Sequence, residues 1–300
     1  MNTHTTTNHT IGYIGLGNMG AAMVRRLLDA GYTVHAWARR PETATAWADT
    51  PVRFHDSIQS LCGAVDLIGL NVTRTEDVEE LLFREDGLFN HAQPGSLIID
   101  FSTIDAARVR SFTAKLQSKG ITYLDSPVSG GVMGAQAGTL AIMVGGPAAG
   151  FNRVQGLLPH LGKTIRHVGE NGAGQAIKAA NQMALCIQLC GIAEAMNYAL
   201  EQGADLGVTL EVLQAGLCGS KVLDWAGPHM VDGFARPPTI QAHLHAKDVD
   251  MVAKAAKAQG LNLPLLYSTA DLLNTLVAQG PSSQDTSRVF SVVRERLQQG

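Results

Sequence analysis

Three glycines near the N-terminus have the spacing that holds a phosphate group. Gly15, Gly17 and Gly20 follow a short apolar run in the pattern G-x-G-x-x-G. The first glycine permits a tight turn, the second lets the backbone approach a pyrophosphate, and the third lets a helix pack closely on a strand. Amide groups at the start of that helix then face the phosphates. The pattern predicts a dinucleotide site, with a purely structural turn as the alternative. The predicted contacts are Gly15, Leu16, Gly17, Asn18, Met19 and Gly20.

Two arginines after the second expected strand bear on the choice of cofactor. An acidic residue about twenty positions past the glycines usually holds the ribose 2′-hydroxyl of NAD. Ala38 stands near that place, and Arg39 and Arg40 follow it. Guanidinium groups bind phosphate through paired, charge-assisted hydrogen bonds. We therefore predict that NADP(H) is preferred, with both arginines on the 2′-phosphate and NAD(H) still possible. A solvated basic turn is the alternative.

A second glycine-rich stretch, residues 124–140, follows another expected strand. Its glycine content predicts a loop rather than the interior of an element. Open α/β sheets bind ligands beyond the carboxyl ends of their strands. Ser129, Gly130 and Gly131 could present a hydroxyl and backbone amides to a small carboxylate. An ordinary crossover loop is the alternative.

Lys178 stands alone in an apolar stretch that predicts a long helix. A buried lysine either pairs with another group or loses its proton easily, which suits acid–base chemistry. The alternative is a side chain that extends to the surface. Asn181 lies one turn further along the same helix face. Together the two side chains could hold one substrate oxygen.

The elements that must position these residues alternate in the first half of the chain. Short apolar runs alternate with helical stretches, which predicts an α/β fold with a mostly parallel, doubly wound sheet covered on both faces. The strands show little polar alternation, as expected for strands buried on both sides. The expected strands are residues 11–15, 33–37, 67–72, 97–100, 123–125, 140–144 and 164–168. The expected helices are residues 19–30, 42–48, 57–61, 76–83, 105–119 and 147–158.

The pattern changes near Gly169. Residues 175–202 contain few charges and predict a long helix that is apolar nearly all round, so we expect it to be buried on most sides, between domains or subunits. Further expected helices are residues 210–215, 246–258, 265–279 and 287–298. We predict a disordered tail at 1–10, a cofactor-binding domain at 11–168, and an all-helical (all-α) substrate and dimerisation domain at 169–300.

Composition narrows the class of protein. Three hundred residues favour two domains. With 23 basic and 26 acidic residues the formal net charge is −3, which argues against a nucleic-acid partner. Charged residues make up 16% and hydrophobic residues 45%, which excludes general disorder and favours an oligomer. We expect no membrane span, because the apolar runs are too short. The polar N-terminus does not resemble a secretory signal, so a cytoplasmic protein is expected by elimination.

We predict no metal site. The four cysteines form no C-x-x-C pair, which argues against structural zinc and a disulfide scaffold. Cys186 and Cys190 are expected to be small core residues. His243 and His245 are two positions apart, which on a helix turns them to different faces. They are read as solvated or pocket-lining histidines.

Four stretches, in this order and spacing, resemble the β-hydroxyacid dehydrogenases. They are residues 12–20, residues 125–131, residues 172–181 and the pair Lys247-Asp248. The match runs from Ile11 to about Leu297. It implies a Rossmann domain followed by an all-helical domain that builds homodimers or homotetramers. It also implies a small-molecule substrate, a hydroxy acid or its semialdehyde.

The resemblance assigns roles to single residues. Lys178 would be the acid or base, protonating the forming alkoxide in reduction and taking the hydroxyl proton in oxidation. Asn181 and Gln182 would bind the substrate, and Ser129, Gly130 and Gly131 would hold its carboxylate. The remaining implied cofactor contacts are Val72, Thr73, Thr103 and Lys247.

The departures from the family pattern leave this interpretation in place. Ser126 replaces the usual Ala, and Thr73 replaces the usual Pro. The arginines at 39 and 40 stand where the NADP users of the family have Asn-Arg-Thr. Imine reductases look similar but lack the lysine at position 178. The chain is too short for the large helical domain of 6-phosphogluconate dehydrogenase.

The substrate remains open among several short acids. Residues 241–248 resemble the corresponding segment of 2-hydroxy-3-oxopropionate (tartronate semialdehyde) reductases, which favours a small polar aldehyde acid. The alternatives are 3-hydroxyisobutyrate, L-threonate, L-serine, and glyoxylate or succinic semialdehyde. Outside this class, the chain could be a catalytically silent nucleotide-binding scaffold.

Overall fold

The structure is a computed structural model that describes residues 9–281 and 283–299. The chain forms two compact units, Met1–Lys178 and Ala179–Gly300. The tail expected at residues 1–10 lies mostly outside the described residues. Thr10, its last residue, is already part of the first strand.

All strands of the first unit join one sheet. They are β1 (Thr10–Ile14), β2 (Thr33–Trp37), β3 (Arg53–Phe54), β4 (Leu67–Leu70), β5 (Leu97–Asp100), β6 (Thr122–Asp125), β7 (Val128–Ser129), β8 (Leu140–Gly145) and β9 (Gly162–Gly169). Among the described residues the order is β3-β2-β1-β4-β5-β6-β8-β7, and β9 pairs with β8. Neighbouring strands from β3 to β6 are parallel, whereas β8 runs antiparallel to β6 and β7. The expected mostly parallel, doubly wound sheet is confirmed.

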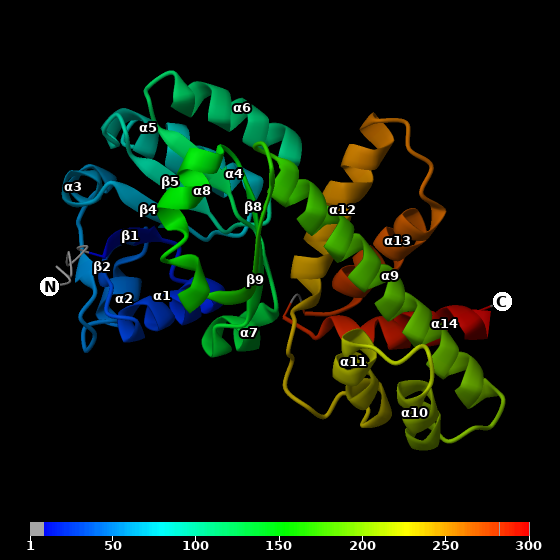
Figure 1. Ribbon diagram of the computed structural model, residues 1–300. Coiled ribbons are helices and arrows are strands. Elements are labelled where there is room, and N and C mark those ends of the chain that lie inside the picture. Colours follow the sequence, from blue (N-terminus) through cyan, green and yellow to red (C-terminus); the bar gives the residue numbers. More distant parts are fainter. Residues whose placement is uncertain (1–8, 282, 300) are drawn as a thin grey trace, which may run out of the picture. The chain divides into compact units, whose positions relative to one another are not determined.

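Helices cover both faces of this sheet (Figure 1). They are α1 (Asn18–Asp29), α2 (Pro41–Thr45), α3 (Ile58–Ala64), α4 (Thr75–Phe83), α5 (Leu88–His91), α6 (Ala106–Gln117), α7 (Gly131–Ala137) and α8 (Ala148–Val154), with a 3₁₀ turn at Leu158–His160. One apolar core packs α1, α7 and α8 against the sheet, with Met23, Ala135 and Val154 buried in it. The other packs α3 to α6 on the opposite face, with Leu61 and Phe112 fully enclosed.

The expected strands are all present, with small differences at their ends. The short strand β3 and the single-turn α5 were not expected, because so few residues carry no readable periodicity. The expectation of a plain loop over residues 124–140 is wrong. This stretch contains β7 and α7, because Gly130 and Gly138 lie at the two ends of α7 and do not interrupt it. Gly130 (φ +135°) precedes α7, and Gly138 (φ +64°) ends it in the left-handed conformation.

The second unit is built from helices around its own core, as expected. They are the rest of α9 (Ala173–Glu201), α10 (Leu206–Ala215), α11 (Lys221–Val231), α12 (Ala242–Ala258), α13 (Pro264–Gln279) and α14 (Val289–Gln299), with a 3₁₀ turn at Thr286–Arg288. Leu189, Met196, Val249 and Leu273 lie in the core of this bundle. Cys186 and Cys190 are buried there too, as the sequence predicts. The helix α11 was not expected.

The long helix α9 departs from its prediction in one respect. We expected burial on most sides, yet 39% of its most apolar window is buried within the chain. The difference arises because a stripe of mostly small or apolar residues on α9 is exposed. The helix is therefore apolar in composition without being buried on most sides. The stripe comprises Ile177, Ala180, Ala184, the polar Gln188, Gly191, Ala195 and Tyr198, with the exposed Glu194 beside it.

Two further observations on α9 concern domain organisation and membranes. The two compact units divide within it, after Lys178, whereas the sequence placed the boundary at 168/169. Among the described residues, α9 is also the helix long and apolar enough to cross a membrane. Its buried Asn197 donates to the carbonyl oxygens of Ala193 and Phe290, each at 2.9 Å. The NH2 group of this side chain is therefore satisfied inside the protein, as in the core helix of a folded domain, while its Oδ1 is buried without a hydrogen-bond partner among the described residues.

Candidate active site

The glycine turn has the geometry of a phosphate cradle. Gly15 adopts φ +101°, and a Cβ there would lie 2.1 Å from the carbonyl oxygen of Asn71. A Cβ on Gly20 would lie 1.9 Å from the carbonyl oxygen of Gly15, so α1 packs against the turn only because this residue has no side chain. A Cβ on Gly17 would meet no atom within 4 Å. Open space at Gly17, next to the first amides of α1, which have no partner within the helix, fits a pyrophosphate.

A cavity of about 230 Å³ lies beside this turn in the first unit. Its lining is Ile14, Gly15, Leu16, Gly17, Trp37, Ala38, Arg39, Arg40, Thr43, Asn71, Val72, Thr73, Asp77, Glu80, Leu81 and Arg84. The structure therefore brings the glycine turn, both predicted arginines and the predicted contacts at 72 and 73 to one cavity. Asn18, Met19 and Gly20 continue from it into α1 but do not line it.

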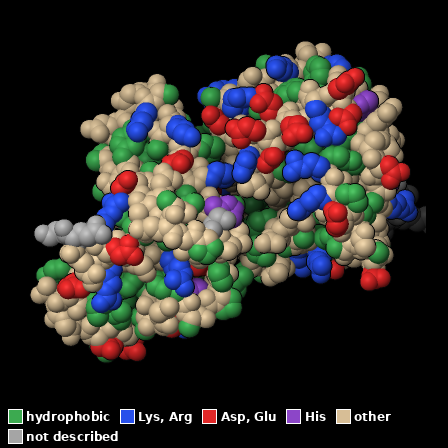
Figure 2. All heavy atoms as spheres, turned by 180° about the vertical axis from the view of Figure 1, so that it is seen from behind, with side chains coloured by type: hydrophobic (Ala, Val, Ile, Leu, Met, Phe, Trp, Pro, Cys, Tyr) green, Lys and Arg blue, Asp and Glu red, His purple; other side chains and the backbone are tan. Residues whose placement is uncertain are grey.

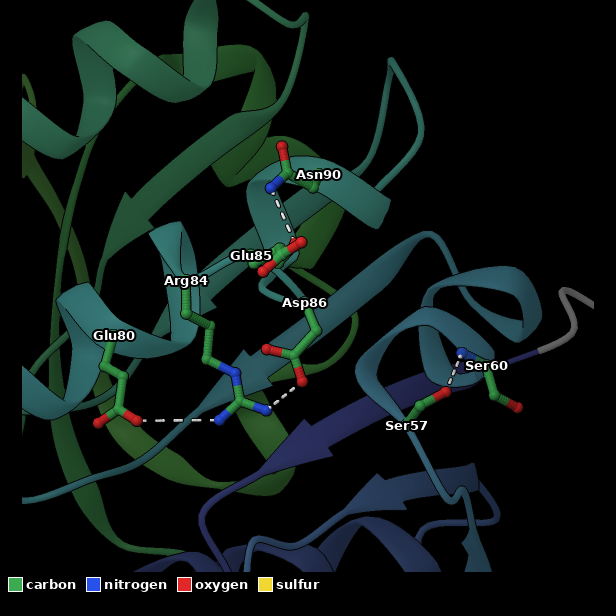
Figure 3. Close-up of polar contacts among 7 residues, drawn as sticks. All are labelled: Ser57, Ser60, Glu80, Arg84, Glu85, Asp86 and Asn90. Atoms are coloured by element: carbon green, nitrogen blue, oxygen red, sulfur yellow. Dashed lines mark hydrogen bonds and ion pairs between the residues drawn. The ribbon is translucent and has the colours of Figure 1, made fainter.

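The α4 wall of the cavity was missed by the sequence analysis. Four lining residues, Asp77, Glu80, Leu81 and Arg84, recur with the spacing of one helix face. That spacing, directly after the loop that carries Val72 and Thr73, was the available signal. Figure 3 shows Arg84 between two carboxylates: its Nη1 lies 3.8 Å from Glu80, and its Nη2 bonds to Asp86. The Arg84 guanidinium also lies over the Trp37 ring, 5.3 Å from its centroid.

The predicted carboxylate-binding residues lie at the β7–α7 junction. Ser129 pairs with Ala141 of β8, Gly130 precedes α7, and Gly131 begins it with φ +62°. A Cβ on Gly131 would meet no atom within 4 Å, so its backbone is accessible. Nearby, Ser126 Oγ is buried and has no hydrogen-bond partner among the described residues. The hydroxyl at this departure from the family pattern is therefore a buried polar group that the described residues leave without a hydrogen bond.

Lys178 stands near the start of α9, where a buried carboxylate fixes the helix. Asp125, at the end of β6, accepts hydrogen bonds from the backbone amides of Gly172 (2.8 Å) and Gln175 (3.0 Å). A carboxylate at a helix N-terminus satisfies amides that lack helical partners. Burial raises the pKa of Asp125, and these amide bonds oppose the increase. Lys178 follows Gln175 by one turn and is 6% exposed, so the expectation of a buried lysine is met.

A second buried carboxylate lies beside the first. Asp100, at the end of β5, pairs in register with Asp125. Its two oxygens accept from the Ser102 amide (2.8 Å) and the Tyr123 hydroxyl (2.6 Å). Burial raises the pKa of Asp100 to about 6, despite these hydrogen bonds. Ser102 directly precedes Thr103, and its own hydroxyl accepts from the Val72 amide at 2.9 Å. This network therefore joins two of the predicted cofactor contacts.

In the second unit, the remaining predicted residues form a separate cluster around Asp248. Gln182 Nε2 donates to Asp248 Oδ2 at 2.7 Å, and Asn181 Nδ2 donates to Gln182 Oε1 at 3.0 Å. Lys247 Nζ lies 2.8 Å from Asp248 Oδ1. Asp248 is 6% exposed and links the two predicted substrate ligands to the predicted cofactor lysine. The sequence pattern included Asp248 but did not indicate this linking role.

The histidines of α12 have other neighbours. His245 is buried, with its ring 6.0 Å from that of Trp225, and His243 is half-buried. In the part of the chain that the structure describes, no three His, Cys, Asp or Glu side chains gather in a way that could hold a metal ion.

Comparison with known proteins identifies the family. Residues 10–169 match the model of the NAD-binding domain of 6-phosphogluconate dehydrogenase, and residues 172–293 match that of the NAD-binding domain of NADP-dependent 3-hydroxyisobutyrate dehydrogenase. The chain is 37% identical to 2-hydroxy-3-oxopropionate reductase of Escherichia coli (strain K12) over 94% of this chain and 96% of that protein. The chain belongs to the β-hydroxyacid dehydrogenase family.

Other members of the β-hydroxyacid dehydrogenase family are also similar. The 3-hydroxyisobutyrate dehydrogenase of Pseudomonas aeruginosa is 35% identical over 85% of this chain and 88% of its own length. The solved structure of Mycobacterium tuberculosis 3-hydroxyisobutyrate dehydrogenase with L-serine superposes with a TM-score of 0.87 at 32% identity, over 95% of this chain and 99% of that chain. This β-hydroxyacid dehydrogenase is therefore an NAD(P)-dependent oxidoreductase acting on a CH–OH group, and it uses a nicotinamide cofactor.

Proposed function

We propose that the enzyme is an NADP(H)-dependent dehydrogenase that interconverts a short 3-hydroxy acid and its semialdehyde. The main observation in support is the position of Lys178, an almost fully buried lysine that follows a helix turn held in place by Asp125. Burial favours proton exchange by an amine, and a positioned acid–base group accelerates proton transfer by about 10²–10⁴. When bound, the nicotinamide cofactor supplies or accepts the hydride.

The chain's own residues take the following proposed roles. The ammonium group of Lys178 donates a proton to the forming alkoxide in reduction, and its neutral amine accepts the hydroxyl proton in oxidation. Asn181 and Gln182 orient the substrate, and the hydroxyl and amides of Ser129, Gly130 and Gly131 hold its carboxylate. Thr103 and Lys247 contact the cofactor. Accessible backbone at Gly131 and a fixed Gln182 amide support these roles.

Preference for NADP(H) rests on the charge distribution in the cavity. Arg39 and Arg40 line it, and Ala38 stands where an acidic residue would favour NAD. The third lining arginine, Arg84, is already paired with Glu80 and Asp86. The arginines at 39 and 40 are therefore the better candidates for the 2′-phosphate.

Our first choice of substrate is 2-hydroxy-3-oxopropionate, the substrate named for the relative at 37% identity. The second is 3-hydroxyisobutyrate, named for relatives at 35% and 32% identity. L-Threonate, L-serine, glyoxylate and succinic semialdehyde complete the set of alternatives. The resemblance at residues 241–248 supports the first choice.

A substrate panel with both cofactors tests the proposal. Each acid or semialdehyde is assayed at matched concentrations of NADPH and NADH, or of the oxidised forms. We expect the highest kcat/KM with 2-hydroxy-3-oxopropionate and NADPH, and a lower KM for NADPH than for NADH. Equal KM values for the two cofactors would contradict the role of Arg39 and Arg40. Tight NADPH binding without turnover of any panel member would favour the silent scaffold instead.

We also propose that the enzyme is a homodimer or homotetramer. The exposed stripe on α9 supports this, because its own side chains are uncharged, although the charged Glu194 lies beside it. Ile177 and Tyr198, near its ends, are 45% and 67% exposed. Uncharged surface of this extent is typical of a face that another subunit covers.

A further inference from the structure

The buried side chain of Gln175 forms hydrogen bonds to the backbone of both neighbours of Thr103, a predicted cofactor contact. Its Oε1 accepts from the Ile104 amide at 3.1 Å, and its Nε2 donates to the Ser102 carbonyl oxygen at 2.8 Å. A single carboxamide therefore binds the backbone on both sides of Thr103. Gln175 is 2% exposed, so these bonds are shielded from water.

The backbone of Gln175 is held just as firmly. Its amide donates to Asp125, which also accepts from Gly172. Glycines make this close approach possible, because a Cβ on Gly145 or Gly174 would lie 2.6 Å or 2.9 Å from an Asp125 oxygen. Gln175 is thus fixed at its backbone by β6 and at its side chain by the loop after β5.

The loop that Gln175 holds is itself anchored to two strands. The Ser102 amide donates to Asp100 of β5, and the Ser102 hydroxyl accepts from Val72 after β4. Gln175 therefore links this anchored loop to the first turn of α9. Lys178 projects from the same helix one turn later.

We propose that Gln175 is a positioning residue that sets the separation between Thr103 and Lys178. This inference rests on the proposed function, in which Thr103 contacts the cofactor and Lys178 exchanges the substrate proton. Hydride and proton transfer need their donors placed together to within a fraction of an ångström, and a misplacement of about 1 Å can lower the rate about 10²-fold. Gln175 touches neither reactant in this scheme and acts through the loop and the helix.

Substitution of Gln175 tests the proposal through the chemical step. In Gln175→Met both hydrogen bonds are lost at nearly constant volume. We expect kcat to fall about 10- to 100-fold, with the substrate KM and the NADPH Kd within about threefold of wild type. The primary isotope effect with deuterated NADPH should rise, because hydride transfer becomes more rate-limiting. Gln117→Met, at an exposed glutamine of α6, is the matched control and should retain wild-type kinetics.

A second variant separates positioning from general destabilisation. In Gln175→Glu a protonated carboxyl can still donate to the Ser102 carbonyl and accept from the Ile104 amide, whereas the carboxylate cannot donate. The kcat of this variant relative to wild type should therefore rise as pH falls from 8 to 5.5. Circular dichroism at each pH measures the folded fraction, and recovery of kcat at a constant folded fraction separates positioning from destabilisation.

The outcomes distinguish this inference from the function on which it rests. An active wild type whose Gln175→Met variant keeps the same kcat and isotope effect would overturn the positioning role alone. The same holds if kcat falls only in proportion to the folded fraction, measured by circular dichroism. A wild type that turns over no panel member would overturn the proposed function, and this role with it.

Discussion

At the scale of single residues, the site depends on side chains that the fold holds away from water. Lys178, Gln175 and Asp125 are each almost fully buried within a short stretch of structure. Charged and polar groups are rarely buried without partners, because desolvation is costly. Amides supply those partners for Asp125, and backbone groups supply them for Gln175. Burying these polar groups costs free energy, which is consistent with a functional role for them.

Replacing Lys178 tests the proposed acid–base role. Lys178→Met keeps much of the side-chain volume and removes the proton donor. We expect kcat to fall by about 10²–10⁴, with NADPH affinity and melting temperature near those of wild type. Steady-state kinetics and isothermal titration provide the measurements. Lys163→Met, at an exposed lysine of β9, is the control. A near-normal kcat in Lys178→Met would refute the role.

The buried Asp100 predicts how stability depends on pH. Its pKa rises from 3.8 to about 6 on folding, so the folded state keeps this proton where the unfolded state releases it. The free energy of unfolding should therefore fall as pH rises from about 4 to about 6. At about 1.4 kcal/mol per pKa unit, the raised pKa of Asp100 lowers the free energy of unfolding by about 3 kcal/mol across this range.

Denaturant unfolding at several pH values measures this contribution. Asp100→Asn cannot ionise, so its stability should lack this decrease between pH 4 and 6. The raised pKa of Asp125 contributes a slope of the same sign in both proteins. Parallel stability curves for wild type and variant would show that Asp100 does not titrate in this range.

At the scale of elements, the sharp turn between β1 and α1 is decisive. Gly15 and Gly20 are required by packing, whereas Gly17 faces open space. Glycine is therefore needed for close backbone packing at positions 15 and 20, and for access of the cofactor phosphates at position 17. The two purposes can be separated by experiment.

A pair of substitutions separates them. Gly15→Ala places a Cβ against the Asn71 carbonyl at a positive φ, so we expect a loss of several degrees in melting temperature. Gly17→Ala should change stability by less than about 1 kcal/mol, but weaken NADPH binding about tenfold or more by blocking the phosphates. Melting curves and titration calorimetry give both quantities. Wild-type affinity in Gly17→Ala would argue against a pyrophosphate at this turn.

At the scale of the whole molecule, charge and apolar surface are distributed differently. Basic and acidic side chains are interspersed on the face in Figure 2, in keeping with a formal net charge of −3. The stripe on α9, by contrast, is largely uncharged, with the charged Glu194 beside it. Assembly of identical chains commonly covers such surface, and a two-fold arrangement would pair the stripe with itself.

Charged substitutions on the stripe test assembly. The double variant Ala184→Glu with Ala195→Glu places charges on its exposed face. We expect light scattering to show an oligomer for wild type and a monomer for this variant, with unchanged far-ultraviolet circular dichroism. Ala148→Glu with Ala149→Glu, at exposed positions of α8, is the matched control and should remain oligomeric. A monomeric wild type, or an oligomeric stripe variant, would contradict the prediction.

Much of the fold is readable from the chain because its signals are local. Apolar runs gave the major strands, and G-x-G-x-x-G gave the first turn, since both depend on neighbours in sequence. The prediction of a loop over residues 124–140 was wrong, because the glycines at 130 and 138 lie at the ends of a helix and do not prevent one. The α4 face with Asp77 and Arg84 was missed, because its importance arises only where it faces the arginines after β2.

The sequence by itself determined the family, the order of elements and the identity of the candidate chemical groups, because motifs and periodicity are written in consecutive residues. Only the tertiary structure decided that Asp125 caps α9, that Gln175 brackets Thr103, and that Asp248 joins Gln182 to Lys247. These contacts link positions that are distant along the chain. They depend on strand order and on how closely glycine lets backbones approach, and no local pattern encodes either.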